Sequence, residues 1–247
     1  MTIRPLIGIL LDYQAEGSFS SRPHNALRCA YFNAVDVAGG IPVALGYTPD
    51  LIDDLLDRLD GLIIPGGFYP FPAIYYGEPE DDAHVHPRAA FEVSLTRRAL
   101  DLDMPVFGIC AGMQVLGILR GAVLHRDIHK AVETNIDHLN GKPAEEIAHT
   151  VAITPGTMLH AIADAREIGV NTAHREGFTE MPDNVIVSAV APDGVIEGIE
   201  YSDHRFCLGV QWHPEFFLER GDPNRRLFEI FCAVAAGQEP PTTSGIF

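Results

Sequence analysis

The sequence predicts an α/β fold, in which a mainly parallel central sheet is flanked by helices. Three observations support this prediction. Short apolar runs alternate with longer helix-like stretches over residues 6–119, which is the order of βαβ units. One apolar run, 104–109, ends in a Gly-x-Cys-x-Gly turn that leads into a second apolar stretch, as at a strand-to-helix elbow. The last third instead contains strand-like runs joined by short turns, which predicts an antiparallel hairpin region.

The first half of the chain supplies the parallel part of this fold. The expected strands are 6–11, 41–45, 61–64 and 106–109, and the expected helices are 26–38, 51–59, 87–100 and the stretch after Cys110. Strands that alternate with helices in this way lie parallel, so their carboxyl ends meet at one edge of the sheet. We therefore expect the functional site at that edge.

The last third supplies the hairpin region and a closing helix. The expected strands are 186–190, 195–201 and 206–211, joined by the turns 191–194 and 202–205. Apolar residues at helical spacing within 224–235 predict a final packing helix. With 247 residues the chain is long enough for one large domain, expected over 1–237, while 238–247 has the composition of a mobile tail.

Composition excludes several classes of protein. The formal net charge of -17 argues against a nucleic-acid or anionic-membrane surface, which needs clustered Lys and Arg. No stretch is apolar enough over a sufficient length to span a bilayer, and no signal peptide precedes the first strand-like run, so a cytoplasmic location is expected. The four cysteines show neither metal-ligand nor disulfide spacing. Cys29, Cys207 and Cys232 are expected to be buried thiols.

Cys110 is the candidate nucleophile. The elbow holds it in a strained backbone conformation, and the small neighbours Gly108 and Gly112 leave room for the turn and for a substrate. The positive end of the following helix favours the thiolate form, which attacks carbonyl carbons. A buried cysteine with a packing role only is the alternative interpretation.

His213 is the candidate base, because it follows an apolar strand and precedes a carboxylate by two residues, in Gln211-Trp-His-Pro-Glu215. His213 could take the Cys110 proton and return one to a leaving amine, while Glu215 holds the imidazole in the useful tautomer. The alternative is a histidine at a strand end beside a solvated acid.

These motifs resemble those of the class I glutamine amidotransferase superfamily, in which the matching elements form a Cys-His-Glu triad. Further runs narrow the similarity to the peptidase C26 family, namely Pro5–Leu11, Tyr31–Val43, Leu59–Gly67, Tyr76–Pro79 and Leu124–Asp127. The resemblance extends from about residue 7 to 231. It implies hydrolysis of a gamma-glutamyl amide, gamma-glutamyl-gamma-aminobutyrate by default, through a cysteinyl thioester. It implies a small-molecule substrate and no cofactor or metal, and leaves homo-oligomerisation open.

The resemblance also implies an oxyanion hole and substrate contacts. The N–H groups of Gly67 and Ala111 would face the tetrahedral oxygen. Ala111 stands where many relatives carry Arg, and this change removes a charge without removing the N–H. Gly66 and Gln114 would contact the glutamyl group.

A second family element, Val170–Gly177, usually reads Asn-Ser-x-His-His-Gln. This chain retains His174 as a candidate substrate contact, but has Arg175 and Glu176 in the next two places. Arg175 could pair with a substrate carboxylate, with Glu176 or with another acid.

Segment 68–87 follows the oxyanion element and is expected to form a loop wall or lid. Its aromatic residues could line a pocket for an apolar amine, and these are Phe68, Tyr69, Phe71, Tyr75 and Tyr76. The run 81–86 invites a metal interpretation, but ordinary loops contain such runs. Four further histidines lack ligand spacing and are expected at the surface, namely His125, His129, His138 and His149.

Three functions fit these observations. The first is a stand-alone gamma-glutamyl amide hydrolase. The second is a glutaminase subunit that passes ammonia to a separate synthetase, and its activity would depend on that partner. The third is a binding protein that holds gamma-glutamyl compounds without turnover. The complete Cys-His-Glu set favours an enzyme.

Overall fold

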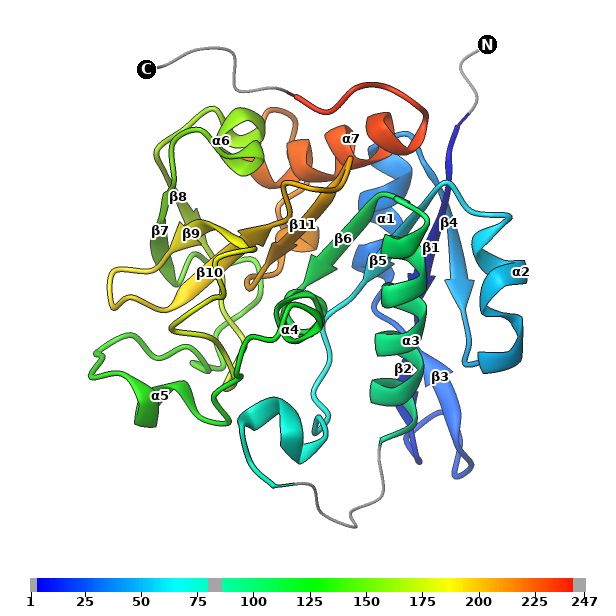
Figure 1. Ribbon diagram of the computed structural model, residues 1–247, viewed down its shortest axis with the longest axis horizontal. Coiled ribbons are helices and arrows are strands. Elements are labelled where there is room, and N and C mark those ends of the chain that lie inside the picture. The colour runs from blue at the N-terminus through cyan, green and yellow to red at the C-terminus, as the bar shows by residue number, and fades with distance from the viewer. Residues whose placement is uncertain (1–3, 80–85, 242–247) are drawn as a thin grey trace.

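A nine-stranded sheet runs through the computed structural model, which describes residues 4–79 and 86–241. The strand order is β4-β1-β5-β6-β11-β10-β9-β7-β8. Figure 1 shows this twisted sheet at the centre, with helices in front of it and behind it. The α/β class predicted from the sequence is therefore confirmed.

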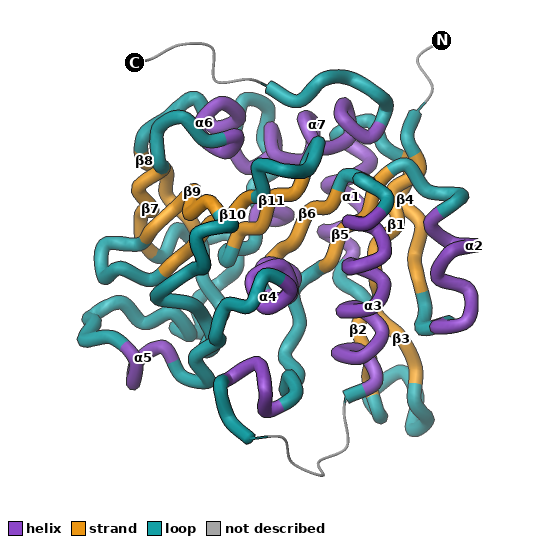
Figure 2. Tube along the Cα trace, in the orientation of Figure 1, coloured by secondary structure: helices purple, strands orange, loops and turns teal. Residues whose placement is uncertain are grey.

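Five neighbouring strands are parallel and form one half of the sheet. They are β4 (Ile41–Leu45), β1 (Leu6–Leu10), β5 (Gly61–Ile64), β6 (Val106–Ile109) and β11 (Cys207–Val210). One face packs on α1 (Cys29–Val37) and α7 (Pro223–Ala235). The other packs on α2 (Ile52–Leu56), α3 (Pro87–Asp101) and α4 (Ala111–Leu119). Figure 2 shows strands sandwiched between these helices, so both faces are covered as expected.

The other half of the sheet is antiparallel. Beyond β11 lie β10 (Ile196–Glu200), β9 (Ile186–Val190), β7 (His149–Ile153) and β8 (Glu167–Val170). The first two confirm the predicted hairpin region. Strands β7 and β8 were not predicted from the sequence, nor were the short helices α5 (Ile128–Ala131) and α6 (Met158–Ala163).

Two predicted helices are shorter in the structure. The helix expected from residue 26 begins at Cys29, because Ala26 ends β3 (His24–Ala26), which pairs with β2 (Asp12–Gln14) in a small separate sheet. The helix expected over 51–59 is α2, preceded by a 3-10 turn at Pro49–Leu51. Backbone hydrogen bonds over residues 53–59 form turns after Leu56 that lead the chain into β5.

The three cysteines other than Cys110 differ in their burial. Cys207 and Cys232 are buried as predicted, whereas Cys29 is exposed, because it opens α1 on the outward side. The expected tail lies in part outside the described residues, which end at residue 241. Within the described ranges, no helix combines the length and apolarity needed to cross a bilayer.

Candidate active site

Cys110 lies at the turn between β6 and α4. Its φ of 53° and ψ of -106° lie in a region that residues with a side chain rarely adopt. The helix starts so close to the sheet that neighbouring positions must be glycine. A Cβ on Gly108 would lie 2.6 Å from the carbonyl carbon of Gly112, and a Cβ on Gly112 would lie 2.0 Å from the Ile64 oxygen. The elbow expected from the sequence is thus present.

Strand pairing brings His213 to the same place. β11 lies parallel to β6, and the Cys110 N–H donates to the Val210 oxygen at 2.8 Å. The chain then continues for three residues to His213, which lines one cavity together with Cys110. Glu215 Oε1 lies 2.8 Å from His213 Nδ1. This contact leaves Nε2 as the nitrogen available to the thiol.

The surroundings of His213 favour its protonated form. Burial lowers the pKa of this imidazole, but the charges of Glu215 and Cys110 outweigh burial and raise the pKa to about 10. A buried imidazolium beside the Glu215 carboxylate is a suitable proton donor for a leaving amine.

Asn171 fixes the backbone of His213. Its Oδ1 accepts the His213 N–H at 2.8 Å, and its Nδ2 donates to the His213 oxygen at 3.0 Å. Asn171 directly follows β8, so the antiparallel half of the sheet positions this histidine. No role for Asn171 was predicted from the sequence. The available signal was that Asn171 matches the first residue of the family pattern in 170–177.

The loop after β5 forms the opposite wall. Gly66 donates its N–H to the Tyr31 hydroxyl at 2.9 Å, and that hydroxyl lies 3.4 Å from His213 Nδ1. A Cβ on Gly66 would lie 2.5 Å from His213 Cε1. Only glycine therefore allows the loop and the imidazole to approach this closely.

Arg88 supports this loop from beneath. Its guanidinium is fully buried and donates to the backbone oxygens of Pro65 and Gly66, and it forms ion pairs with Asp12 and Glu92 at 2.9 Å each. Arg88 was not predicted from the sequence as part of the site, because a charged residue within a helix pattern is usually solvated.

The backbone N–H groups of Gly67 and Ala111 are the expected oxyanion donors. Both residues line a cavity with Cys110. Ala111 is the first residue of α4, and the N–H groups of a first helical turn lack intrahelical acceptors. A Cβ on Gly67 would lie 2.2 Å from Arg88 Nη1, so the loop passes directly over that side chain.

Two cavities meet at Cys110. The first, of about 290 Å³, has a wall of aromatic residues from 68–71 and a polar wall that contains Gln114, Arg126, Arg175 and Glu176. The second, of about 410 Å³, is lined by His213, Tyr31 and Arg28, and by Asp12 and Gln14. The cysteine is therefore open to ligand groups on two sides.

The expected substrate residues surround the first cavity in different ways. Gln114 is buried and donates from Nε2 to the Glu176 oxygen at 3.0 Å, which leaves its own oxygen as an acceptor. Arg175 is half exposed and pairs with Asp127 at 3.1 Å, so its partner in the structure is an acid other than Glu176. Burial raises the pKa of Glu176, whose carboxylate accepts from the Tyr76 hydroxyl at 2.8 Å.

His174 faces inward. Its Nδ1 lies 3.0 Å from the Glu176 oxygen and its Nε2 lies 3.2 Å from Glu197 Oε1. His138 and His149 meet the same carboxylate, each at 3.4 Å. The expectation that these two histidines lie at the surface was wrong, because the fold turns both side chains inward against Glu197 of β10. His129 is exposed as expected.

Segment 68–79 contributes one exposed ring. Phe68 is 74% exposed and borders both cavities, whereas Tyr69, Phe71 and Tyr76 are buried. Arg126 stacks on Tyr76, 3.7 Å from the ring centre, and was not singled out from the sequence. Of the run 81–86, for which the sequence favoured an ordinary loop over a metal site, residues 81–85 lie outside the described residues.

Known proteins share this sequence pattern and fold. The family model described as Peptidase C26 matches residues 5–215. The gamma-glutamyl-gamma-aminobutyrate hydrolase of Escherichia coli O157:H7 is 32% identical over 240 residues, which cover 93% of each chain. Protein NtpR of Enterococcus hirae is 31% identical and covers 92% of this chain and 98% of the relative. Other relatives carry provisional glutamine amidotransferase names.

Solved structures show the same fold at lower sequence identity. The glutaminase domain of Trypanosoma brucei CTPS, with bound acivicin, matches with a TM-score of 0.63 at 19% identity and covers 95% of both chains. The predicted class I glutamine amidotransferase fold is thus confirmed.

Proposed function

Because this chain belongs to the peptidase C26 family, we propose that it hydrolyses a small gamma-glutamyl amide to glutamate and a free amine. One observation carries the proposal. Cys110 sits at a strained elbow between two cavities, and His213, which follows the neighbouring strand and pairs with Glu215, lines the second cavity with it. The name of the Escherichia coli relative supports gamma-glutamyl-gamma-aminobutyrate as the first substrate to test.

The first step forms a thioester. The Cys110 thiolate attacks the gamma-carbonyl carbon, and the carbonyl oxygen becomes an oxyanion between the N–H groups of Gly67 and Ala111. The carbon–nitrogen bond then breaks while His213 transfers its proton to the departing nitrogen. Glu215 keeps the proton on Nδ1 and balances the imidazolium charge.

The second step releases glutamate. Neutral His213 takes a proton from water, whose oxygen attacks the thioester carbon. Collapse of this second tetrahedral intermediate breaks the carbon–sulfur bond and restores the Cys110 thiolate and the His213 imidazolium. The cycle consumes one water molecule and needs no co-reactant.

The proton transfer indicates which part of the substrate occupies each cavity. The leaving nitrogen must lie beside His213, so the amine occupies the second cavity and the glutamyl group the first. A glutamyl group ends in an ammonium and a carboxylate. Glu176 suits the ammonium, and Arg126 suits the carboxylate, although it also pairs with Glu78 at 2.7 Å.

The second cavity favours an amine that carries a carboxylate. Arg28 lines it with a side chain that is 61% exposed and lies 4.0 Å from Glu215, too far for a strong pair. Its guanidinium is thus available to an anionic group at the far end of the amine, as in an aminobutyrate.

The test is glutamate release from a panel of gamma-glutamyl amides and from free glutamine. The panel compares amines with and without a terminal carboxylate. Wild-type protein is expected to turn over the carboxylated amides without a partner protein, and Cys110→Ala to turn over none. Arg28→Gln should raise KM for carboxylated amides alone. The matched control is Cys29→Ala, which removes an exposed thiol outside both cavities.

Two outcomes would contradict the proposal. Activity on glutamine that appears only with an added synthetase would indicate a glutaminase subunit. Binding of the amides without turnover by the wild-type protein would indicate a binding protein on the same fold.

A further inference from the structure

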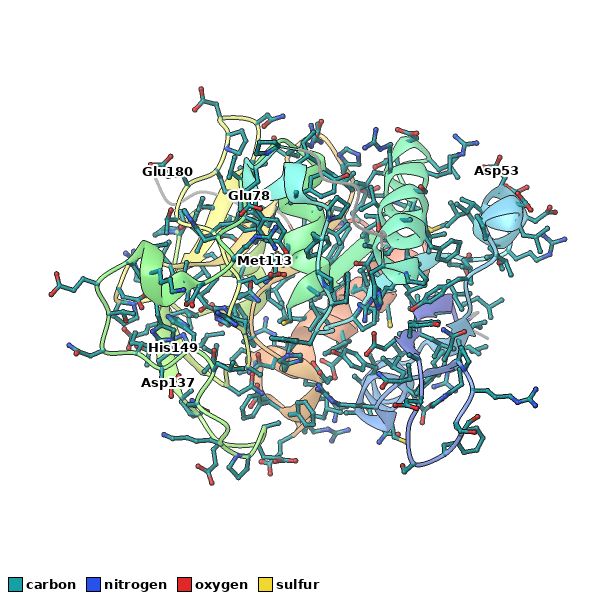
Figure 3. The ribbon with its side chains drawn as sticks, turned by 90° about the horizontal axis from the view of Figure 1, so that it is seen from below. Asp53, Glu78, Met113, Asp137, His149 and Glu180 are labelled. Atoms are coloured by element: carbon teal, nitrogen blue, oxygen red, sulfur yellow. The ribbon has the colours of Figure 1, made fainter. Side chains whose placement is uncertain are left out.

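A second group of titratable side chains lies outside the nucleophile and base described above. His138, His149 and His174 converge on the Glu197 carboxylate, and all four side chains are at least nine-tenths buried. The rings of His138 and His174 are 4.7 Å apart between centroids. We call these four residues the histidine cluster. Figure 3 labels His149, at the opposite end of the molecule from Asp53 of α2.

Outer contacts fix the tautomers of two of these rings. His138 Nε2 lies 2.9 Å from Asp193 Oδ2, and His174 Nδ1 lies 3.0 Å from the Glu176 oxygen. Both oxygens can only accept, so these outward nitrogens carry the protons. In the neutral rings, the inward atoms His138 Nδ1 and His174 Nε2 therefore present lone pairs to Glu197.

Lone pairs facing a carboxylate repel it unless a cation lies between them. A single Glu197 oxygen faces three imidazole nitrogens, and the other Glu197 oxygen has no hydrogen-bond partner within the described part of the chain. Neither nitrogen of His149 has one there either. Buried polar atoms without partners are costly. The cluster thus has the electrostatics of a cation site.

The spacing fits a tetrahedral metal ion. Ligand atoms at about 2.0–2.1 Å from Zn²⁺ lie about 3.3–3.4 Å from each other in a tetrahedron. The inward nitrogens of His138 and His174 lie 3.4 and 3.2 Å from Glu197 Oε1. The candidate ligand atoms of these three residues all lie within 4.8 Å of one another, whereas His149 lies outside this group.

We propose that the histidine cluster binds a Zn²⁺ ion through His138 Nδ1, His174 Nε2 and Glu197, which leaves the fourth tetrahedral position to water. Imidazole and carboxylate together suit zinc better than calcium or magnesium. Asp193 and the Glu176 carbonyl orient the two rings from outside, as outer hydrogen bonds do for metal-bound histidines.

The ion would stiffen the wall of the first cavity. The Glu176 oxygen that accepts from His174 also accepts from Gln114 Nε2, at 3.0 Å. The His174 N–H and the Thr172 hydroxyl both donate to the His138 oxygen at 2.9 Å. Zinc at the cluster would therefore hold the 172–176 segment and the side chain of Gln114 in place.

Metal content and thermal unfolding test the proposal. Protein stripped with a chelator and dialysed is titrated with Zn²⁺, and bound metal is counted by mass spectrometry. About one Zn²⁺ per chain is expected, and Tm should rise by roughly 5–10 °C when free zinc exceeds Kd about 100-fold. The assay uses Cys110→Ala, so that the thiol cannot bind the metal and the result does not depend on the proposed hydrolysis.

Variants locate the ion. Glu197→Gln and His174→Gln should abolish the zinc-dependent rise in Tm. If these buried substitutions prevent folding, Asp193→Asn keeps the test decisive, because it alters only an outer partner and should weaken zinc binding about 10- to 100-fold. The matched control is His160→Gln, which changes a histidine of α6 outside the cluster and should bind zinc as Cys110→Ala alone does.

Two results would overturn the proposal. One is the absence of zinc binding by folded Cys110→Ala protein. The other is a zinc response in Asp193→Asn equal to that of the control. Either result would mean that protons, not a metal, balance the Glu197 charge.

Discussion

Two buried centres in the described part of the chain contain imidazole groups beside a carboxylate. They differ in the number of imidazoles per carboxylate and in how accessible they are to ligands. At the active centre one imidazole, His213, has one carboxylate, Glu215, and a cavity open to ligands on its other side. At the histidine cluster three imidazoles share Glu197, and the four side chains are at least nine-tenths buried, with His174 also bordering the first cavity. The same residue types therefore suit proton transfer in one place and cation binding in the other.

The two centres are nevertheless joined through one short segment. Asn171 holds the backbone of His213, while His174, three residues later, belongs to the histidine cluster. This segment leaves β8 at the edge of the antiparallel half and ends beside the first cavity. A substitution at one centre need not impair the other, so activity and the zinc response of each variant measure how independent the two centres are.

The largest expected effect is that of Cys110→Ala. Without the thiol no thioester forms, so kcat/KM for gamma-glutamyl amides should fall by at least about 10⁴-fold. Glutamate release measures the loss, and zinc binding, measured on the same protein, should persist. Activity within about tenfold of wild type would place the nucleophile elsewhere.

Glu215→Gln should have the next largest effect. The amide can no longer balance the His213 imidazolium or impose the Nδ1–H tautomer, so kcat should fall by about 10²- to 10⁴-fold. Because Glu215 does not contact the histidine cluster, the zinc-induced change in Tm should be unaltered. An unchanged kcat would show that His213 works without its carboxylate.

Asn171→Ala probes the joining segment. Loss of both bonds to the His213 backbone lets the imidazole shift, and a displacement of this kind should lower kcat about 10- to 100-fold with little change in KM. Asn171→Asp keeps the acceptor for the His213 N–H and should recover part of the loss. Equal changes in kcat and KM for both variants would indicate general damage to the fold.

The pH dependence of stability separates His213 from other groups. Burial opposes the protonation of His213, but Glu215 and Cys110 raise its pKa to about 10, above the ordinary value of about 6.5. Its stabilising contribution is thus complete below about pH 6.5 and is lost as pH rises toward 10. Urea unfolding should show this loss, by at least about 1 kcal/mol more in wild type than in Glu215→Gln. Equal losses of stability in the two proteins would mean that a group other than His213 causes the pH dependence.

How far the sequence predicts each centre depends on how local its parts are. Cys110 is marked by the glycines on either side, and Glu215 is two residues from His213, so short motifs identify all three. Four of the five parallel strands were also predictable, since they are the short apolar runs that alternate with helices, whereas 206–211 was expected in the hairpin region. The parallel pairing of β6 with β11, which brings Cys110 and His213 to one place, was not predicted from the sequence.

The histidine cluster has no such local signal. Its proposed ligands come from a loop, from the segment after β8 and from β10, and of the two strands only β10 was predicted from the sequence. Arg88 was missed for a related reason, because its burial depends on the loop after β5 folding over it. Sequence reasoning fails where burial is decided by distant segments.

The smallest expected effect concerns the open face that distinguishes the active centre from the histidine cluster. Phe68 is an exposed ring where the two cavities meet, so it gains apolar contact only when a ligand arrives. Phe68→Ala should lower kcat/KM for amides of apolar amines about 3- to 10-fold and leave free glutamine unaffected. Phe19→Ala, which removes another exposed ring, is the matched control. If the preference among amides stays the same in Phe68→Ala, the amine does not reach this ring, and Arg28 and its neighbours in the second cavity alone select it.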